Sequence, residues 1–189
     1  MSVSGSSSSR GSSSSRGTSH STHSTRSTKS TRSTKASGVA KKSTKAYGAN
    51  PKLAKAVKSI NIQKYAKKGH TTFCNQAFNA YAGKLGYKGF QGKVANQMFT
   101  SMKAGKDGWH QVSAKDAIAA AKAGKLVAAG WYNNTPQAGR PDGKRPGHIA
   151  AVIGEYAPGV PGIAQAGTKT FEWGPVTASR KNPTYFVRN

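Results

Sequence analysis

The sequence predicts an α+β domain of about 140 residues, preceded by a basic segment that has no side chains suited to a core. The chain of 189 residues fits one compact domain, and apolar side chains with a structural period begin near residue 50. From there to about residue 123, apolar residues recur at helical spacing, whereas short apolar runs divided by Gly and Pro follow. Helices followed by strands are typical of an antiparallel sheet packed on helices.

Residues 1–46 consist mainly of Ser, Thr, Gly, Arg, Lys and His in short imperfect repeats, such as 6–11 and 12–17. No apolar period is present to offset the entropy of ordering this backbone, so we predict a disordered tail. Its composition resembles that of the arginine-serine segments of RNA-binding proteins. Two roles are open, a solvated linker and an electrostatic anchor for polyanions.

The charge balance is strongly basic, with 30 Lys and Arg against 5 Asp and Glu and a formal net charge of +25. Such a field attracts nucleic acid, anionic lipid headgroups, or the phosphates and carboxylates of a bacterial envelope. The N-terminus lacks the apolar core of a secretory signal, and no run reaches the roughly 18 apolar residues that span a bilayer. We therefore expect synthesis in the cytoplasm, no transmembrane segment, and a separate route if the protein acts outside the cell.

Helix start and stop signals divide the first half of the domain. Asn50 is a good N-cap and Pro51 fits the first helical position, while Ser113 and Asp116 form a capping pattern further along. Glycines follow where helices are expected to end. The expected helical segments are 51–60, 62–67, 74–85, 94–102 and 114–123.

The second half of the domain has the character of strands. The segment 132–146 contains paired Asn, several Pro and several Gly, and is predicted to be a long polar loop. The expected strands are 126–131, 148–153, 162–166, 170–173 and 184–187.

Cys74 is the only cysteine, so it cannot form an internal disulfide. It opens an apolar-periodic run and is expected in the first turn of a helix. The free N–H groups and the helix dipole there favour the thiolate, which is the nucleophilic form.

A thiolate that attacks an acyl group needs a base and a third group that orients the base. His148, at the head of a short buried strand, is the best candidate base. Gln165 on the following antiparallel strand is the candidate orienter, and Glu155 near the turn is its rival. The cysteine and the scattered histidines show no pair of ligands at metal spacing, and no cofactor is implied.

Four motifs together resemble the papain-like peptidoglycan hydrolases of the NlpC and CHAP type, including phage lysins. They are Thr72–Asn75, Gly108–Val112, Pro146–Val152 and Ile163–Gly167. The resemblance covers about residues 60–170 and implies a papain-like fold for the domain at 47–189, in which N-terminal helices pack on a small antiparallel sheet. It also implies a Cys-His-polar triad that cleaves an amide bond in or next to the peptide stem.

In that triad Cys74 is the nucleophile, His148 the base and then the acid, and Gln165 the third residue. The expected substrate contacts are Asn75, His70, Trp109 and Trp131. The leading hypothesis is thus a monomeric cysteine amidase or endopeptidase whose partner is peptidoglycan, acting at the bacterial cell wall after release or carried in a virion. Its basic tail would bind anionic wall polymer, outer-membrane lipid or nucleic acid.

Two alternatives remain open at this point. One is a nucleic-acid-binding structural protein, as in a virion, with an inactive papain-like domain. The other is a cysteine protease or acyltransferase that uses the same triad on protein or lipid. The amide bond that is cleaved also stays open, because substrate choice depends on the shape of the loops.

Overall fold

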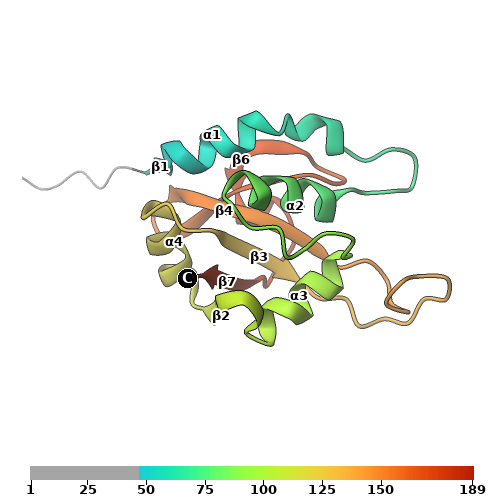
Figure 1. Ribbon diagram of the computed structural model, residues 1–189. Coiled ribbons are helices and arrows are strands. Elements are labelled where there is room, and N and C mark those ends of the chain that lie inside the picture. Colours follow the sequence, from blue (N-terminus) through green and yellow to red (C-terminus); the bar gives the residue numbers. More distant parts are fainter. Residues whose placement is uncertain (1–46) are drawn as a thin grey trace, which may run out of the picture. The chain divides into compact units, whose positions relative to one another are not determined.

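The computed structural model describes residues 47–189, a mixed structure of helices and antiparallel strands, as the sequence predicts (Figure 1). The predictions for residues 1–46 lie outside the described residues. The α-helices are α1 (Pro51–Ser59), α2 (Cys74–Lys84), α3 (Ala95–Lys103) and α4 (Ala114–Lys122). Three short 3-10 helices complete the helical segments, η1 (Ile62–Tyr65), η2 (Lys106–Gly108) and η3 (Val176–Ala178).

The strands form one sheet in the order β2-β7-β3-β4-β5-β6, and every pairing within it is antiparallel. The two-residue β1 pairs with the later part of β4. The strands are β1 (Gly48–Ala49), β2 (Trp109–Val112), β3 (Val127–Trp131), β4 (His148–Ala157), β5 (Val160–Gln165), β6 (Phe171–Pro175) and β7 (Thr184–Arg188).

The predicted helix starts are confirmed by their caps. The Asn50 side-chain oxygen accepts hydrogen bonds from the backbone N–H groups of Lys52 at 3.0 Å and Leu53 at 3.3 Å, and Pro51 takes the first helical position of α1. The Ser113 hydroxyl accepts from the N–H of Asp116 at 3.1 Å and so caps α4. These caps satisfy N–H groups that have no partner inside the helix.

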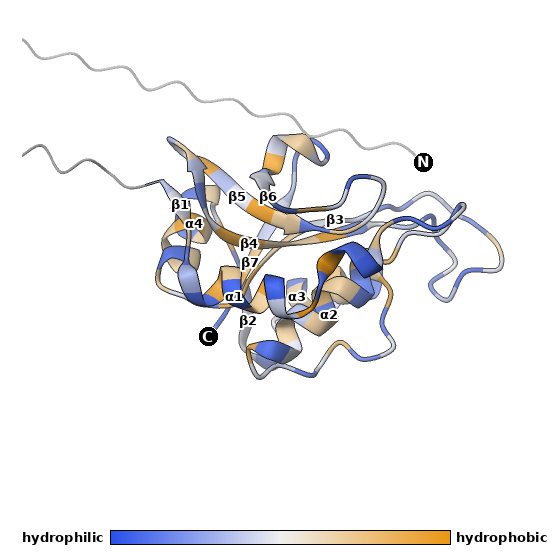
Figure 2. Cartoon of the chain, turned by 90° about the horizontal axis from the view of Figure 1, so that it is seen from above, coloured by the Kyte–Doolittle hydropathy of each residue, from blue (hydrophilic) through white to orange (hydrophobic). Residues whose placement is uncertain are grey.

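Helices α1, α2 and α3 lie together on one side of the sheet (Figures 1 and 2). Strand β4 is central, and its residues from His148 to Glu155 are all buried. Successive side chains of a strand point to opposite faces, so both faces of β4 are covered. The hydrophobic colouring along β4 in Figure 2 agrees with this position.

Two strands have no counterpart in the sequence prediction. Strand β2 lies between helical segments and pairs at the edge of the sheet with β7, the last strand of the chain. Strand β1 pairs with Gly154 and Glu155, and a Cβ at Gly154 would overlap the Gly48 carbonyl oxygen. A glycine is therefore required where these two backbones meet.

Nowhere in residues 47–189 is a helix both long enough and apolar enough to span a membrane.

Candidate active site

Cys74 is the first residue of α2, as the sequence predicts. The inward face of this helix, formed by Ala77, Phe78 and Tyr81, packs into the core and fixes the position of its first turn. The Cys74 side chain is 4% exposed and borders a cleft of about 250 Å³. The nucleophile candidate therefore lies at the boundary between the core and an opening to solvent.

The sequence analysis expects the helix terminus to favour a thiolate at Cys74, whereas the raised pKa favours the thiol in the protein without substrate. Burial raises the pKa of the thiol, because the thiolate loses hydration. The backbone N–H groups of Ile149, Asn75 and Cys74 itself lower the pKa, but by less than burial raises it. The helix terminus acts in the predicted direction, yet desolvation is the larger effect and the resting group is a thiol.

His148 and Gln165 meet as predicted. The His148 Nε2 lies 2.9 Å from the Gln165 Oε1, across the neighbouring strands β4 and β5, and both side chains are buried. A carbonyl oxygen can only accept, so Nε2 carries the proton in this pair. In the neutral ring Nδ1 is then left as a proton acceptor, the role that a general base requires.

Trp131 packs on the imidazole, and Gly167 lies close to the ring. Trp131 pairs with His148 across β3 and β4, and the two ring centroids are 5.2 Å apart. Gly167 lies at the other edge, where a Cβ would sit 3.6 Å from Cε1 and 4.0 Å from Nδ1 of the ring. Trp131 was predicted to contact substrate, but it is 7% exposed and packs on His148 instead.

Burial also lowers the pKa of His148, to about 4. The hydrogen bond with Gln165 raises it, and the charge of Arg180 lowers it further. The imidazole is consequently neutral at pH 7 and able to accept a proton. The resting pair is a thiol and a neutral imidazole.

Arg180 is a cation that acts on the candidate site from a distance, and the sequence analysis does not include it. Its positive charge lowers the pKa of both Cys74 and His148, because it favours the anion and disfavours the cation. The Arg180 carbonyl oxygen accepts a hydrogen bond at 3.2 Å from the indole N–H of Trp131, which also reaches the Lys181 carbonyl at 3.0 Å. Arg180 precedes β7 and lies far from the other site residues in sequence, so no local pattern could have indicated it.

The start of α2 forms part of the cleft. No side chain caps this helix, in contrast to α1 and α4, and its residues Cys74 to Gln76 line the cleft. The first N–H groups of a helix have no partner within it and suit a developing negative charge. The cleft thus has potential donors for an oxyanion next to the thiol.

His70 and Asn75 line the same cleft, in agreement with the positions predicted for them. His70 is exposed. The Asn75 amide donates to the Lys93 carbonyl oxygen at 3.0 Å, which ties the first turn of α2 to the segment before α3. Asn75 therefore also stabilises the shape of the cleft.

Trp109 does not reach the cleft, although the sequence analysis placed it among the substrate contacts. It is 2% exposed and lies in an aromatic cluster with Phe78, Tyr87 and Phe90. Its ring centroid is 5.6 Å from that of Phe90 and 5.7 Å from that of Tyr87. The structure gives Trp109 a packing role in the core, where β2 meets α2.

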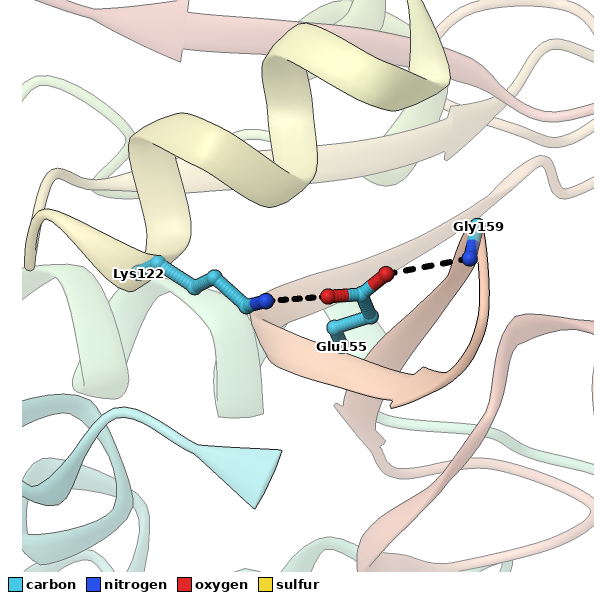
Figure 3. Close-up of polar contacts among 3 residues, drawn as sticks. All are labelled: Lys122, Glu155 and Gly159. Atoms are coloured by element: carbon cyan, nitrogen blue, oxygen red, sulfur yellow. Dashed lines mark hydrogen bonds and ion pairs between the residues drawn. The ribbon is translucent and has the colours of Figure 1, made fainter. Parts of the chain in front are cut away.

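Glu155, the rival candidate for the orienting group, does not lie beside His148. It lies at the opposite end of β4 from His148, forms an ion pair with Lys122 of α4, and accepts a hydrogen bond from the Gly159 N–H at 3.0 Å (Figure 3). Its carboxylate therefore joins α4 to the β4–β5 turn. Of the two candidates for the orienting group, Gln165 is the one that contacts His148.

A scan of the sequence against protein-family models finds no match, and neither does a search of curated proteins.

Proposed function

We propose that residues 47–189 form a papain-like cysteine hydrolase that cleaves an amide bond in or next to the peptide stem of peptidoglycan. The observation that supports it best is the Nε2 to Oε1 hydrogen bond of 2.9 Å between His148 and Gln165. The choice of peptidoglycan as substrate comes from the four motifs that resemble the NlpC and CHAP hydrolases.

The proposed reaction begins with transfer of the thiol proton to Nδ1 of His148. The thiolate attacks the carbonyl carbon of the scissile amide, and N–H groups at the start of α2 stabilise the oxyanion. The imidazolium then donates its proton to the leaving amine, and the carbonyl group stays on sulfur as a thioester. Water, deprotonated by the neutral imidazole, hydrolyses the thioester and restores the thiol.

The resting protonation states fit this order of events. The thiol is not ionised beforehand, so proton transfer and attack are coupled, as in enzymes that activate a hydroxyl with histidine. The Gln165 carbonyl oxygen accepts a hydrogen bond from Nε2–H of the neutral imidazole and so fixes this tautomer. It can accept the same hydrogen bond when His148 is an imidazolium. Arg180 favours the thiolate as it forms.

The basic segment supplies the proposed targeting. It carries nine of the 30 Lys and Arg residues and none of the acids. These are Arg10, Arg16, Arg26, Lys29, Arg32, Lys35, Lys41, Lys42 and Lys45. We propose that they bind an anionic polymer or lipid of the envelope, or nucleic acid if the protein is carried in a virion.

The deciding experiment is incubation of the full-length protein with purified peptidoglycan, followed by identification of new amino and carboxyl termini by mass spectrometry. Cys74→Ser should abolish cleavage while the folded structure remains, since a serine hydroxyl is close in size but far less acidic. His148→Ala should cost about as much, because the two residues act as a unit.

Wild-type turnover by the Ser variant would assign Cys74 a structural role and remove the mechanism. Absence of cleavage by the wild-type protein, combined with tight binding of nucleic acid by residues 47–189, would favour a structural nucleic-acid-binding protein. The net charge of +25 is the observation that keeps this second function open.

A further inference from the structure

The wall of the cleft opposite α2 is formed by the loop between β3 and β4, and Asn96 of α3 holds this loop. Asn96 is 2% exposed. Its amide nitrogen lies 3.1 Å from the Asn133 carbonyl, 2.7 Å from the Asp142 carboxylate and 3.1 Å from the Arg145 carbonyl. Its oxygen accepts from the Asn133 N–H at 3.1 Å. One buried amide thus connects both ends of the loop to a helix.

The loop also bonds to itself. Pro136 and Lys144 form an isolated antiparallel bridge, and the Gln137 N–H donates to the Gly143 carbonyl at 2.9 Å. Where the loop enters β4, a Cβ at Gly147 would overlap the Asn96 oxygen, so the loop closes tightly on α3. The polar residues that the sequence indicates as a long loop therefore present side chains from a defined backbone.

Two cations of this wall line the cleft, Arg140 and Lys144. The acid between them, Asp142, already uses both oxygens, one for the Asn96 amide and the other for the Lys144 N–H at 3.3 Å. Lys144 directs its ammonium group toward the Tyr132 hydroxyl. Within residues 47–189, no ion pair joins Arg140 or Lys144 to a carboxylate.

We infer that the cleft selects a substrate that carries a free carboxylate, which Arg140 binds and Lys144 attracts. The inference rests on the proposed function and adds one property of the substrate, a negatively charged group next to the scissile amide. A planar guanidinium matches the two oxygens of a carboxylate, and charge-assisted hydrogen bonds of this kind are about twice as strong as neutral ones. A cleft of this kind would distinguish a stem peptide with free carboxylates from one in which they are carboxamides.

The test uses two synthetic N-acylated tetrapeptides of stem type that differ only in having carboxylates or carboxamides. Binding to full-length Cys74→Ala protein is measured by calorimetry at about 0.15 M salt, where long-range attraction is screened. We expect the carboxylate peptide to bind about 10- to 100-fold more tightly. Arg140→Gln should reduce this preference to about twofold, and Lys144→Gln should reduce it by less.

Lys115→Gln is the matched control, because it removes one positive charge from an exposed position of α4 outside the cleft lining. It should leave the preference unchanged. An equal preference with and without Arg140→Gln in the Cys74→Ala protein overturns the inference. An equal loss of preference in Lys115→Gln, or failure of both peptides to bind, also overturns it.

Failure of the proposed function gives a different result. Cleavage of peptidoglycan by the wild-type protein with no carboxylate preference removes this inference alone. A carboxylate preference that depends on Arg140, in a protein whose wild-type form cleaves no peptidoglycan, removes the proposed function and leaves the binding site in place.

Discussion

The hydrogen bond between His148 and Gln165 sets the tautomer of the imidazole, so it determines which ring nitrogen can accept a proton. We expect Gln165→Ala to lower kcat by about 10- to 1,000-fold, since the amide orients the ring but transfers no proton itself. Steady-state kinetics on a soluble stem peptide measure this loss, and KM should change much less.

The control for this substitution is Glu155→Gln at the far end of β4. It should leave kcat within about twofold in folded protein, because Glu155 lies at the β4–β5 turn. A larger loss of kcat from Glu155→Gln than from Gln165→Ala would show that the wrong residue has been assigned to the site.

The lowered pKa of His148 also predicts how the free energy of unfolding depends on pH. Its pKa is about 4 in the folded protein against 6.5 for the ordinary side chain, so the unfolded chain binds an additional proton between these values. Stability should therefore fall as the pH is lowered from 6.5 to 4, by about 3 kcal/mol in total, and this contribution should level off below pH 4. Urea unfolding at a series of pH values measures the slope.

The comparison with variants isolates the contribution of one histidine from that of the carboxyl groups. His148→Gln should flatten the slope between pH 4 and 6.5, whereas His110→Gln, at an exposed position, should leave it as in the wild type. An unchanged slope in His148→Gln would mean that the imidazole is not desolvated as the structure indicates.

At the scale of elements, the ion pair between Lys122 and Glu155 fastens α4 to β4. Glu155 is 2% exposed, so loss of the Lys122 ammonium group removes part of the compensation for a buried carboxylate. We expect Lys122→Met to lower the free energy of unfolding by about 2 to 3 kcal/mol, less than for a fully buried pair because the lysine is partly exposed. Chemical denaturation measures the difference.

Lys125→Met provides the reference for that experiment, since Lys125 is exposed just beyond the same helix. It should change the free energy of unfolding by no more than about 0.5 kcal/mol. If both variants lose equally little, the pair contributes no net stability and only fixes the position of α4.

The elements that could be predicted from the sequence are those with local signals. Caps at Asn50 and Ser113 and the helical period after Cys74 predict α1, α4 and α2, and all three are present. Strand β2 has only four residues, and its pairing with β7 depends on a partner more than 70 residues away. Such long-range pairings leave no pattern in the strand itself.

The same distinction applies to the site. Cys74 begins α2 and His148 contacts Gln165, and both features could be predicted from motifs and from strand order. Arg180 approaches the site through the segment before β7, and Asn96 acts on a loop about 40 residues further along the chain. The thiol form of Cys74 could not be predicted because burial depends on the whole fold.

At the scale of the whole molecule, the proposed function assigns binding of polyanions to residues 1–46 and catalysis to residues 47–189. Removal of residues 1–46 should leave hydrolysis of soluble stem peptides unchanged but weaken cosedimentation with intact sacculi and with DNA, most strongly at low salt. Exposed charges are screened beyond about 8 Å at physiological ionic strength, so the difference between the two forms should shrink as salt rises.

The salt series with full-length and truncated protein also tests the alternative role of the segment. Equal pelleting of the two forms at low salt would mean that residues 1–46 act as a linker only. The basic surface of residues 47–189 would then account for the attraction.

Strand β1 fixes the point at which residues 1–46 join the domain. It pairs with Gly154 and Glu155, up to seven residues along β4 from His148. At about 3.3 Å per residue this is a separation of roughly 23 Å between the junction and the imidazole. Under the proposed function, a polymer bound by the basic segment would be tethered to the domain through this junction, while cleavage would take place at the other end of β4. Such a tether raises the local concentration of neighbouring bonds, so successive cuts should cluster along one strand of the wall.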